Sequence, residues 1–395
     1  MRKIRTKLLL AFIFISLIPL VSIGWYALSN ISNSLKSSIT AKLNDKVHLI
    51  SFEIEDFLKN VSNDLFYLRD SVTLRTLIGD VFSPSANDIN TLRKNLEKDF
   101  LAFSKHKKIY HQVRFLDATG MEVVRVDRNQ GESAIVAKDR LQNKKKRYYF
   151  ADTAELNNGQ LMISPLDLNR ERGKVEQPLR PVIRYGTPVY DKSNQFKGIV
   201  LFNVMADKFL KLVREKNRGY EQLYFIDNKG YYYSHRNAKK EWGSQTDLNT
   251  GENFKTDFPG AAKQIISAQN PNTIILQDNL IASAPVFVDK KKYTLLGNVV
   301  EVVPATEVYR SVTTFRNVFL GISMVVFIAT LFLAVVLAKS ITDPIIYLTK
   351  TTEAMSKGEL TSSVVVASKD ETKLLAEAIE RLRKSMVILL KRKQK

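Results

Sequence analysis

Residues 318–350 read VFLGISMVVFIATLFLAVVLAKSITDPIIYLTK, and this stretch decides how the chain is organised. Residues 318–338 are apolar and uncharged, and a helix that spans a bilayer needs about 20 such residues. After them the sequence becomes polar but keeps a helical spacing, through Ile341, Ile345, Leu348, Thr352 and Met355. The stretch therefore predicts a membrane span that continues as an amphipathic helix, an arrangement suited to passing on a mechanical displacement.

A second apolar stretch lies at residues 8–28 (LLLAFIFISLIPLVSIGWYAL), and it also carries no charge. The alternative is a cleaved signal peptide, but the stretch is long for one and Ala27-Leu28-Ser29 is a poor cleavage site. The positive-inside rule predicts a cytoplasmic N-terminus, because four basic residues precede the stretch: Arg2, Lys3, Arg5 and Lys7. Two spans would place residues 29–317 outside the inner membrane, with both termini in the cytoplasm.

Composition excludes several kinds of site. The 395-residue chain has no cysteine, which excludes disulfides, thiolate metal sites and cysteine nucleophiles. Its four histidines lack the spacing of metal ligands, and no glycine-rich phosphate loop or nucleophile–base pair occurs. We therefore expect no cofactor, no metal and no catalytic domain in this chain.

The net charge of +20 suggests that the chain binds, or lies beside, something negatively charged. Nucleic acid is the first candidate for a pI of 9.7, but most of the chain is predicted to lie outside the cytoplasm. Anionic membrane lipid, or an anionic small molecule, fits the charge better. The basic run at 144–147 is expected to be a solvated surface rather than a site for nucleic acid.

A long helix is predicted after the first span. Its apolar residues step by three or four without interruption, through Ile31, Leu35, Ile39, Leu43, Val47, Ile50, Ile54, Phe57, Val61, Leu65, Leu68 and Val72. Such a helix would be about 60 Å long. It predicts a stalk that packs on its own domain over one part and pairs with a second copy over another. Ser83-Pro84-Ser85 then breaks the pattern, and residues 88–104 predict another helix.

Beyond this region the hydrophobic period changes to two, which indicates strands. Residues 113–127 predict a hairpin around Ala118-Thr119-Gly120, with further strands at 160–164, 181–190 and 196–205 and a helix at 207–216.

The strand pattern occurs twice. FIDNKG at 225–230 repeats FLDATG at 115–120, APVF at 284–287 repeats TPVY at 187–190, and 293–303 mirrors 196–205. Matched blocks in the same order predict a duplicated antiparallel module.

Four segments carry a resemblance to a known family: VRFLDATGMEVVRVDR, LQNKKKRYYF, SPLDLNRERGKVEQP and RPVIRYGTPVYD. With the two spans and the long helix, they resemble the double-Cache (tandem PAS-like) sensor domains of bacterial receptors, histidine kinases and diguanylate cyclases. The resemblance implies an extracytoplasmic α+β domain that senses a ligand or a dimer contact. It also implies that the pocket lies in the membrane-distal module.

The segment after Ala338 resembles a HAMP domain, whose two helices per chain form a parallel four-helix bundle in a homodimer. Pro344 is expected near the start of the first helix and Gly358 at its end. Residues 368–371 are expected to cap the second helix, whose seam would be Leu374, Ala378, Leu382, Met386 and Leu389. The sequence departs from the family at Thr372-Lys373 and Ala378. The resemblance implies signal-relay roles for Pro344, Gly358, Leu360 and Glu371.

These patterns predict an α+β chain of seven segments. They are a cytoplasmic N-terminus (1–7), a first transmembrane helix (8–28), a stalk and helical region (29–108), a distal Cache module (109–218), a proximal Cache module (219–317), a second transmembrane helix (318–338) and a HAMP domain (339–395).

Candidate ligand residues concentrate in the distal module. Arg147 and Arg184 could hold a carboxylate in bidentate fashion, Tyr148 and Tyr149 could form a wall, and an acid could receive an amine. The full predicted set is Arg147, Tyr148, Tyr149, Asp152, Asp167, Asn169, Glu176 and Arg184. The alternative is that these arginines and tyrosines are solvated or pair with nearby acids. Amino-acid-binding double-Cache domains resemble this region, with Asn203 near the place of their aspartate.

The sequence predicts a dimeric receptor that senses an extracytoplasmic small molecule, or a periplasmic binding protein, and relays the signal to a separate cytoplasmic output protein. The alternative is the input portion of a histidine kinase, a diguanylate cyclase or a chemotaxis receptor, because the sequence KRKQK at 391–395 follows the last predicted helix directly and no output domain is expected in this chain. A structural adhesin is disfavoured by the HAMP-like segment.

Overall fold

The structure is a computed structural model that describes residues 4–81, 85–171, 173–217, 219–276, 278–289, 294–367 and 370–393. It contains two compact units. The outer unit is Ser37–Val308, and the membrane unit combines Met1–Lys36 with Tyr309–Lys395. The predicted break at Ser83-Pro84 lies outside the described residues.

The outer unit begins within α1 (Ile4–Arg69), a continuous helix. Its predicted stripe is buried from Leu43 to Leu68, with one difference. Leu58 is fully buried, whereas Phe57 is half-buried and packs against Phe209 with ring centroids 5.6 Å apart. The helix ends before the predicted Val72, because Ser71 caps a separate short helix. Two helices follow, α2 (Val72–Leu77) and α3 (Ala86–Lys107).

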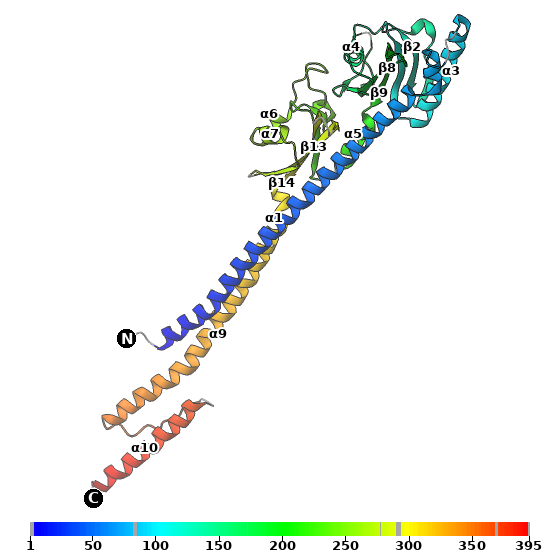
Figure 1. The fold of residues 1–395 in the computed structure, drawn as a ribbon. Helices are drawn as coiled ribbons and strands as arrows, with labels where there is room; N and C mark the ends of the chain where they lie inside the picture. Colours follow the sequence, from blue (N-terminus) through cyan, green and yellow to red (C-terminus); the bar gives the residue numbers. More distant parts are fainter. Residues whose placement is uncertain are drawn as a thin grey trace. The chain divides into compact units, whose positions relative to one another are not determined.

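The distal module is one antiparallel sheet with strand order β3-β2-β1-β9-β8-β4, and β5 also pairs with β8. Figure 1 shows α3 beside this sheet. The predicted strands at 181–190 and 196–205 are confirmed as β8 and β9. The elements of this module, in chain order, are β1 (Tyr110–Asp117), β2 (Glu122–Asn129), β3 (Glu132–Ile135), η1 (Lys138–Arg140), α4 (Tyr148–Ala154), β4 (Met162–Ile163), β5 (Asp167–Leu168), β6 (Arg170–Glu171), β7 (Lys174–Val175), β8 (Pro181–Tyr190), β9 (Phe196–Met205) and α5 (Asp207–Glu215).

The proximal module is a smaller antiparallel sheet with order β11-β10-β14-β13-β12, and α6 and α7 pack on one of its faces. The predicted first residue of its last strand, Tyr293, lies outside the described residues. The elements are β10 (Gln222–Ile226), β11 (Tyr232–Ser234), η2 (Ala238–Lys240), α6 (Phe254–Asp257), α7 (Pro259–Ile266), β12 (Asn272–Ile275), β13 (Asn279–Asp289), β14 (Thr294–Pro304) and α8 (Ala305–Val308).

The two modules repeat each other in detail. Asp117 and Asp227 each accept hydrogen bonds from backbone amides two and four residues later, which closes the first turn of each sheet. Gly198 and Gly297 lie where a Cβ atom would come within 2.0 and 2.1 Å of a carbonyl oxygen on the neighbouring strand. Equivalent glycines and aspartates at equivalent places confirm the predicted duplication.

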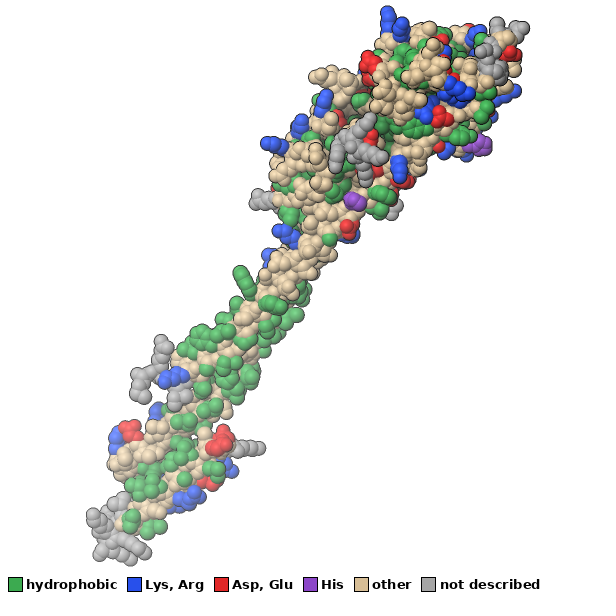
Figure 2. Space-filling view, viewed as in Figure 1, with side chains coloured by type: hydrophobic (Ala, Val, Ile, Leu, Met, Phe, Trp, Pro, Cys, Tyr) green, Lys and Arg blue, Asp and Glu red, His purple; other side chains and the backbone are tan. Residues whose placement is uncertain are grey.

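The membrane unit holds the apolar part of α1 and two further helices, α9 (Arg310–Ser356) and α10 (Glu371–Lys393). Both α1 and α9 are long and apolar enough to span a membrane, and hydrophobic side chains cover this segment in Figure 2. The expectation that Pro344 starts a helix is wrong, because α9 continues through it. Buried residues of α9 before and after Pro344, such as Ala338 and Leu348, compensate for the backbone hydrogen bond that is lost because proline has no N–H.

The C-terminal helices of the membrane unit share a small core. Leu348, Met355, Val364 and Ala376 are buried together, and Leu360, Ile379 and Met386 pack against them. Gly358 has φ +97° and ends α9 as predicted. The predicted seam on α10 is only partly right within one chain, because Met386 packs on this core whereas Leu374, Ala378, Leu382 and Leu389 are exposed. The predicted cap at Ser368 lies outside the described residues, and Asp370 accepts from the amide of Thr372 at 2.9 Å.

Candidate functional site

The candidate site begins with a row of polar residues across three strands of the distal sheet. Strand register places Arg184 on β8 beside Asn203 on β9, and Asn203 beside Gln112 on β1. Arg114 lies two residues along β1 on the same face, because side chains of a strand alternate. This is the face against which α4 packs, together with Leu116, Ile199 and Leu201. The alternation of β1, β8 and β9 therefore delivers polar groups to one buried place.

Arg184 is the centre of the row and is 3% exposed. Its Nη1 donates to Asp167 Oδ1 at 2.7 Å and to the Tyr148 hydroxyl at 3.3 Å, and its Nη2 donates to Asn169 Oδ1 at 3.3 Å. Burial opposes its charge, but Asp167 together with Tyr148 and Tyr149 outweighs burial, so the pKa of Arg184 is raised. Burial also raises the pKa of Asp167, despite the arginine beside it.

Tyr149 is surrounded by positive charge. The guanidinium carbons of Arg114, Arg147 and Arg184 lie 5.4, 5.6 and 5.8 Å from the centre of its ring. Burial by itself would raise the pKa of the Tyr149 hydroxyl, but Arg114, Lys144 and Arg147 together outweigh burial, so that pKa is lowered. Cations over an aromatic face are attracted by its quadrupole. The Tyr149 ring therefore lies close to three arginines, two of which also have a carboxylate partner: Arg114 with Glu122 at 3.5 Å and Arg184 with Asp167 at 2.7 Å.

A second layer fixes Asn169. Its Nδ2 donates to Glu176 Oε2 at 2.8 Å, and its Oδ1 also accepts from Asn203 at 3.3 Å. Glu176 in turn lies 2.9 Å from Arg180 and 3.3 Å from His111. Burial tends to raise the pKa of Glu176, but the hydrogen bonds from His111 and Asn169 lower it. Asn169 is therefore held on both sides.

The structure brings seven of the eight predicted residues into one network: Arg147, Tyr148, Tyr149, Asp167, Asn169, Glu176 and Arg184. Their roles differ from the simple grip that was expected. Arg184 and Glu176 already have protein partners, as the alternative interpretation held. The guanidinium of Arg147, in contrast, has no ion pair among the residues that the structure describes. Asp152, the eighth, is exposed on α4.

Sequence reasoning missed Arg114 and Gln112. Arg114 is 2% exposed and donates from Nη2 to Asn203 Oδ1 at 2.6 Å, while its Nε has no hydrogen-bond partner in the described part of the chain. Gln112 Oε1 accepts from Asn203 at 3.1 Å. The signal was available for Arg114, because this polar residue stands between apolar ones on a predicted strand, whereas Gln112 lies just before that predicted strand.

The network borders a cleft between the two modules, with a volume of about 880 Å³. Tyr148, Asp152 and Asp167 line it from the distal module. The modules touch beside the cleft, where the Leu168 amide donates to Asp247 at 3.0 Å and Arg170 donates to the Thr246 carbonyl at 2.6 Å. Within the described ranges no group of three or more potential ligands is arranged to hold a metal ion.

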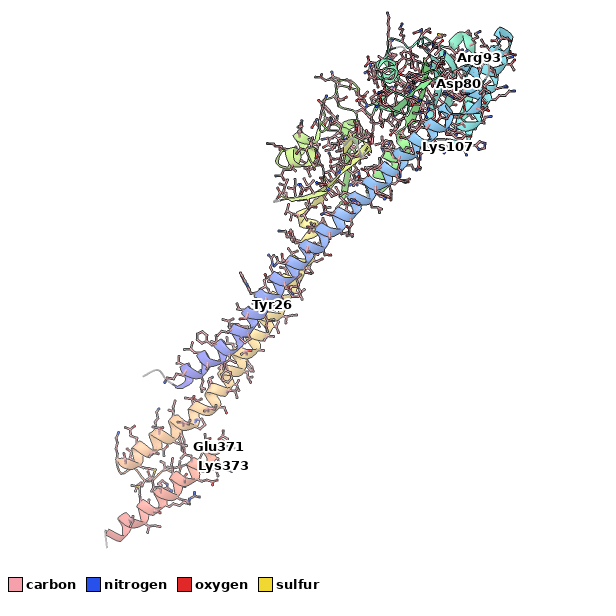
Figure 3. The ribbon with its side chains drawn as sticks, in the orientation of Figure 1. Tyr26, Asp80, Arg93, Lys107, Glu371 and Lys373 are labelled. Atoms are coloured by element: carbon pink, nitrogen blue, oxygen red, sulfur yellow. The ribbon has the colours of Figure 1, made fainter. Side chains whose placement is uncertain are left out.

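The predicted relay residues lie in the membrane unit. Leu360 packs on the shared core, and its carbonyl accepts from Arg383 Nη1 at 2.6 Å. Glu371 begins α10 and is exposed, as is the nearby Lys373; both are labelled in Figure 3. Pro344 lies inside α9 and Gly358 follows its end.

Comparisons with known proteins agree with this architecture. The family model for the bacterial histidine kinase sensor domain matches residues 79–283, and that for the HAMP domain matches residues 336–387. A comparison with curated proteins gave no match.

Solved sensor domains share the fold at low sequence identity. The extracellular domain of the candidate histidine kinase vpHK1S-Z8 is 19% identical with a TM-score of 0.59, and the match covers 71% of this chain and 96% of that one. A domain of a candidate sensory box/GGDEF family protein from Vibrio parahaemolyticus is 21% identical (TM-score 0.53; 70% and 97% covered). The sensory domain of the Campylobacter jejuni chemoreceptor Tlp3 is 14% identical (TM-score 0.50; 70% and 97% covered). The predicted α+β sensor fold is confirmed.

Proposed function

This chain belongs to the bacterial histidine kinase sensor-domain family and carries a HAMP domain, and we propose that it is an inner-membrane receptor for an extracytoplasmic small molecule. Its helices α1 and α9 would be the two spans. The basic residues before residue 8 favour a cytoplasmic N-terminus, so the two sheet modules would lie on the opposite side.

One observation carries the proposal. The α4 face of the distal sheet buries a charged network, in which Arg114 and Arg184 are almost fully enclosed. Burying charges is costly, and well-packed apolar residues in their place are often as stable or more stable. A core that needed only stability would not require this network, whereas a site that recognises polar groups would. Arg147, with no ion pair among the described residues, supplies a group that a ligand can engage.

The cleft between the modules supplies the route by which a ligand reaches the network. Tyr148 and Asp167 line the cleft and also contact Arg184. A ligand that competes for either side chain would change the hydrogen bonds of the buried arginine. Because Leu168 is bonded to Asp247, that change would reach the proximal module. The proximal module leads through β14 and α8 into α9.

Helix α9 would carry the signal across the membrane. In this proposal the helix carries the change into a HAMP bundle formed by two copies, which a cytoplasmic output protein, or an output domain of the same receptor, then reads. The receptor works only if the ligand binds one of two states better than the other. The contact between Leu360 and Arg383 belongs to the core that would rearrange.

The test uses the full-length chain in lipid nanodiscs and a panel of amino acids, organic acids and amines. A ligand that binds only the folded state stabilises it by about 2.7 kcal/mol at a hundredfold excess over Kd, so thermal unfolding detects it. We expect Arg147→Ala to reduce the shift given by a ligand that carries a carboxylate, and to leave the shift of a purely cationic ligand, without changing the unliganded melting temperature. Arg140→Ala, which removes an exposed arginine of the same module, is the matched control and should keep the shift.

The relay is tested separately. The chain has no cysteine, so Leu382→Cys introduces a single exposed thiol on α10. We expect the rate of disulfide formation between two copies to change when the ligand is added. If no small molecule shifts the melting temperature of the folded chain, the proposal fails, and sensing of a periplasmic protein becomes the better account.

A further inference from the structure

The inter-module cleft has features that the predicted distal residues do not explain. Its volume of about 880 Å³ falls within the range of small-molecule sites, about 300–1,000 Å³. Much of its lining comes from the proximal module. These residues include Asp227, Tyr231, Tyr233, Trp242 and Asp247.

The charged groups of the cleft are mainly acidic. Of the described residues that line it, Asp152, Asp167, Asp227 and Asp247 are acids, and Lys229 is the one base. The arginines of the distal network lie behind this wall, and Arg184 already pairs with Asp167. A carboxylate or phosphate that entered would therefore meet like charge first.

The four acids differ in how far the protein satisfies them. Asp247 accepts from the Leu168 amide at 3.0 Å and from the Ser244 hydroxyl at 2.6 Å. Asp227 accepts from two amides of its own turn, yet burial still raises its pKa. Asp152 has no hydrogen bond or ion pair to any described residue. Negative charge at Asp152 and Asp227 is thus left for a ligand to balance.

Tyr233 provides an observation independent of the acids. The residue is 8% exposed and lines the cleft, and its ring packs on Trp242 with centroids 5.5 Å apart. Its hydroxyl has no hydrogen bond to any residue that the structure describes. Burial raises its pKa well above the usual value, and the charges of Asp227, Asp247 and Asp167 add to this effect. The hydroxyl therefore stays protonated, close to these carboxylates.

The Tyr233 oxygen is therefore open to a ligand N–H that enters the cleft. The same ligand would place its positive charge near Asp152 and Asp227, in a cleft that Tyr148, Tyr231 and Trp242 also line. Aromatic faces attract ammonium groups, and more strongly when water is excluded.

We propose that the cleft between the two modules is a binding site for an organic amine in its cationic form, held by Asp152, Asp227 and the Tyr233 hydroxyl. The inference rests on the proposed sensing function and names its ligand class. It replaces the anionic small molecule that the net charge of the chain suggests. Because both modules contribute side chains, an amine in this site would also draw the two modules together.

The experiment is isothermal titration calorimetry on the full chain in nanodiscs of zwitterionic lipid. The probes are putrescine, phenethylamine and choline, with succinate and acetate as anionic probes. We expect at least one amine to bind and both anions to give no heat. Asp152→Asn should weaken amine binding about tenfold, which corresponds to 1.4 kcal/mol. Tyr233→Phe should weaken binding of the primary amines but not of choline, which has no N–H to donate.

Asp56→Asn is the matched control, because Asp56 is an exposed acid on α1 outside the cleft. This variant should bind the amine with the same affinity as the unchanged chain. Asp152 is exposed and has no hydrogen bond or ion pair to a described residue, so its variant should fold normally. Thermal unfolding of each unliganded variant checks this. Tyr233→Phe keeps the ring and its contact with Trp242.

The outcomes separate the two claims. Amine binding that neither Asp152→Asn nor Tyr233→Phe weakens would overturn the site. Binding of anions or of uncharged metabolites, with no amine binding, would overturn the ligand class but leave the sensing function intact. A folded chain that binds no small molecule of any class would overturn the inference and the proposed function together.

Discussion

The Lys46 ammonium on α1 lies 2.5 Å from Oε1 of Glu301 on β14, and 2.6 Å from Glu221. Glu301 is fully buried, and its Oε2 has no hydrogen-bond partner among the described residues. The contact joins the helix that follows the first span to the strand that precedes α8 and α9. One lysine therefore ties together the two elements that connect the outer unit to the membrane.

Removing this lysine should be costly. Lys46→Met leaves the Glu301 carboxylate buried without its cation, and breaking such a pair costs about 3 kcal/mol. We expect a matching fall in the free energy of unfolding, measured by chemical denaturation. Lys46→Met combined with Glu301→Gln should recover most of the loss, because the carboxylate that remains, Glu221, is partly exposed to water. Equal losses in the single and double variants would show that the pair contributes nothing.

The same pair should make stability depend on pH. Burial raises the pKa of Glu301 above its usual 4.5, despite the charge of Lys46. Between pH 4.5 and the raised pKa the folded chain binds a proton that the unfolded chain does not, so stability falls as pH rises through this window. Glu301→Gln has no such proton. We therefore expect the melting temperature of the unchanged chain to fall, relative to that of Glu301→Gln, as pH rises through this window.

The equivalent glycines of the two modules should be equally intolerant of a side chain. Gly198→Ala and Gly297→Ala would each bring a Cβ within about 2 Å of a neighbouring carbonyl oxygen, so strand pairing must shift. We expect each to destabilise the outer unit by about 3 kcal/mol. Gly260→Ala is the control, since the nearest atoms to its Cβ are 3.8 Å away and the residue is in a helix. That variant should be neutral or slightly stabilising.

The contact between modules can be loosened without touching the buried network. Asp247→Ala removes the acceptor of the Leu168 amide, and Arg170→Ala removes the donor to the Thr246 carbonyl. We expect faster hydrogen–deuterium exchange at residues 167–171 in both variants, with unchanged exchange in β9. Exchange that quickens across the whole distal sheet would instead indicate general unfolding.

Periodicity predicted much of this fold. The ends of β8 and β9 follow from alternating apolar residues, and the duplication follows from repeated turns at Asp117 and Asp227. Pro344 was misplaced because local propensity is overridden when a helix is held on both sides of a proline. β6 and β7 were missed, since two-residue strands have too few positions for a period to show.

Seven of the eight predicted residues lie in one network, but the contacts between them were not predicted. Asp167 and Asn169 were predicted because polar and charged residues concentrate at 167–176, and Arg184 because an arginine can hold a carboxylate. That Arg184 donates to both others depends on how β5 pairs with β8, which a single sequence does not fix. The proximal wall of the cleft was missed for a similar reason, because Tyr233 and Trp242 look like ordinary core residues until two modules face each other.

Because α9 continues without a break from Arg310 to Ser356, a rotation of the helix at one end turns the whole helix. Each residue of a helix turns it by about 100° and advances it by about 1.5 Å. One alanine inserted after Ala338 would turn every later residue of α9 by that angle, Leu348 and Met355 included, while four would restore the facing to within about 40°. The side of Leu348 that meets α10 is thus set by the helix phase where α9 begins, at Arg310. A small twist at that point changes which side chains face the core.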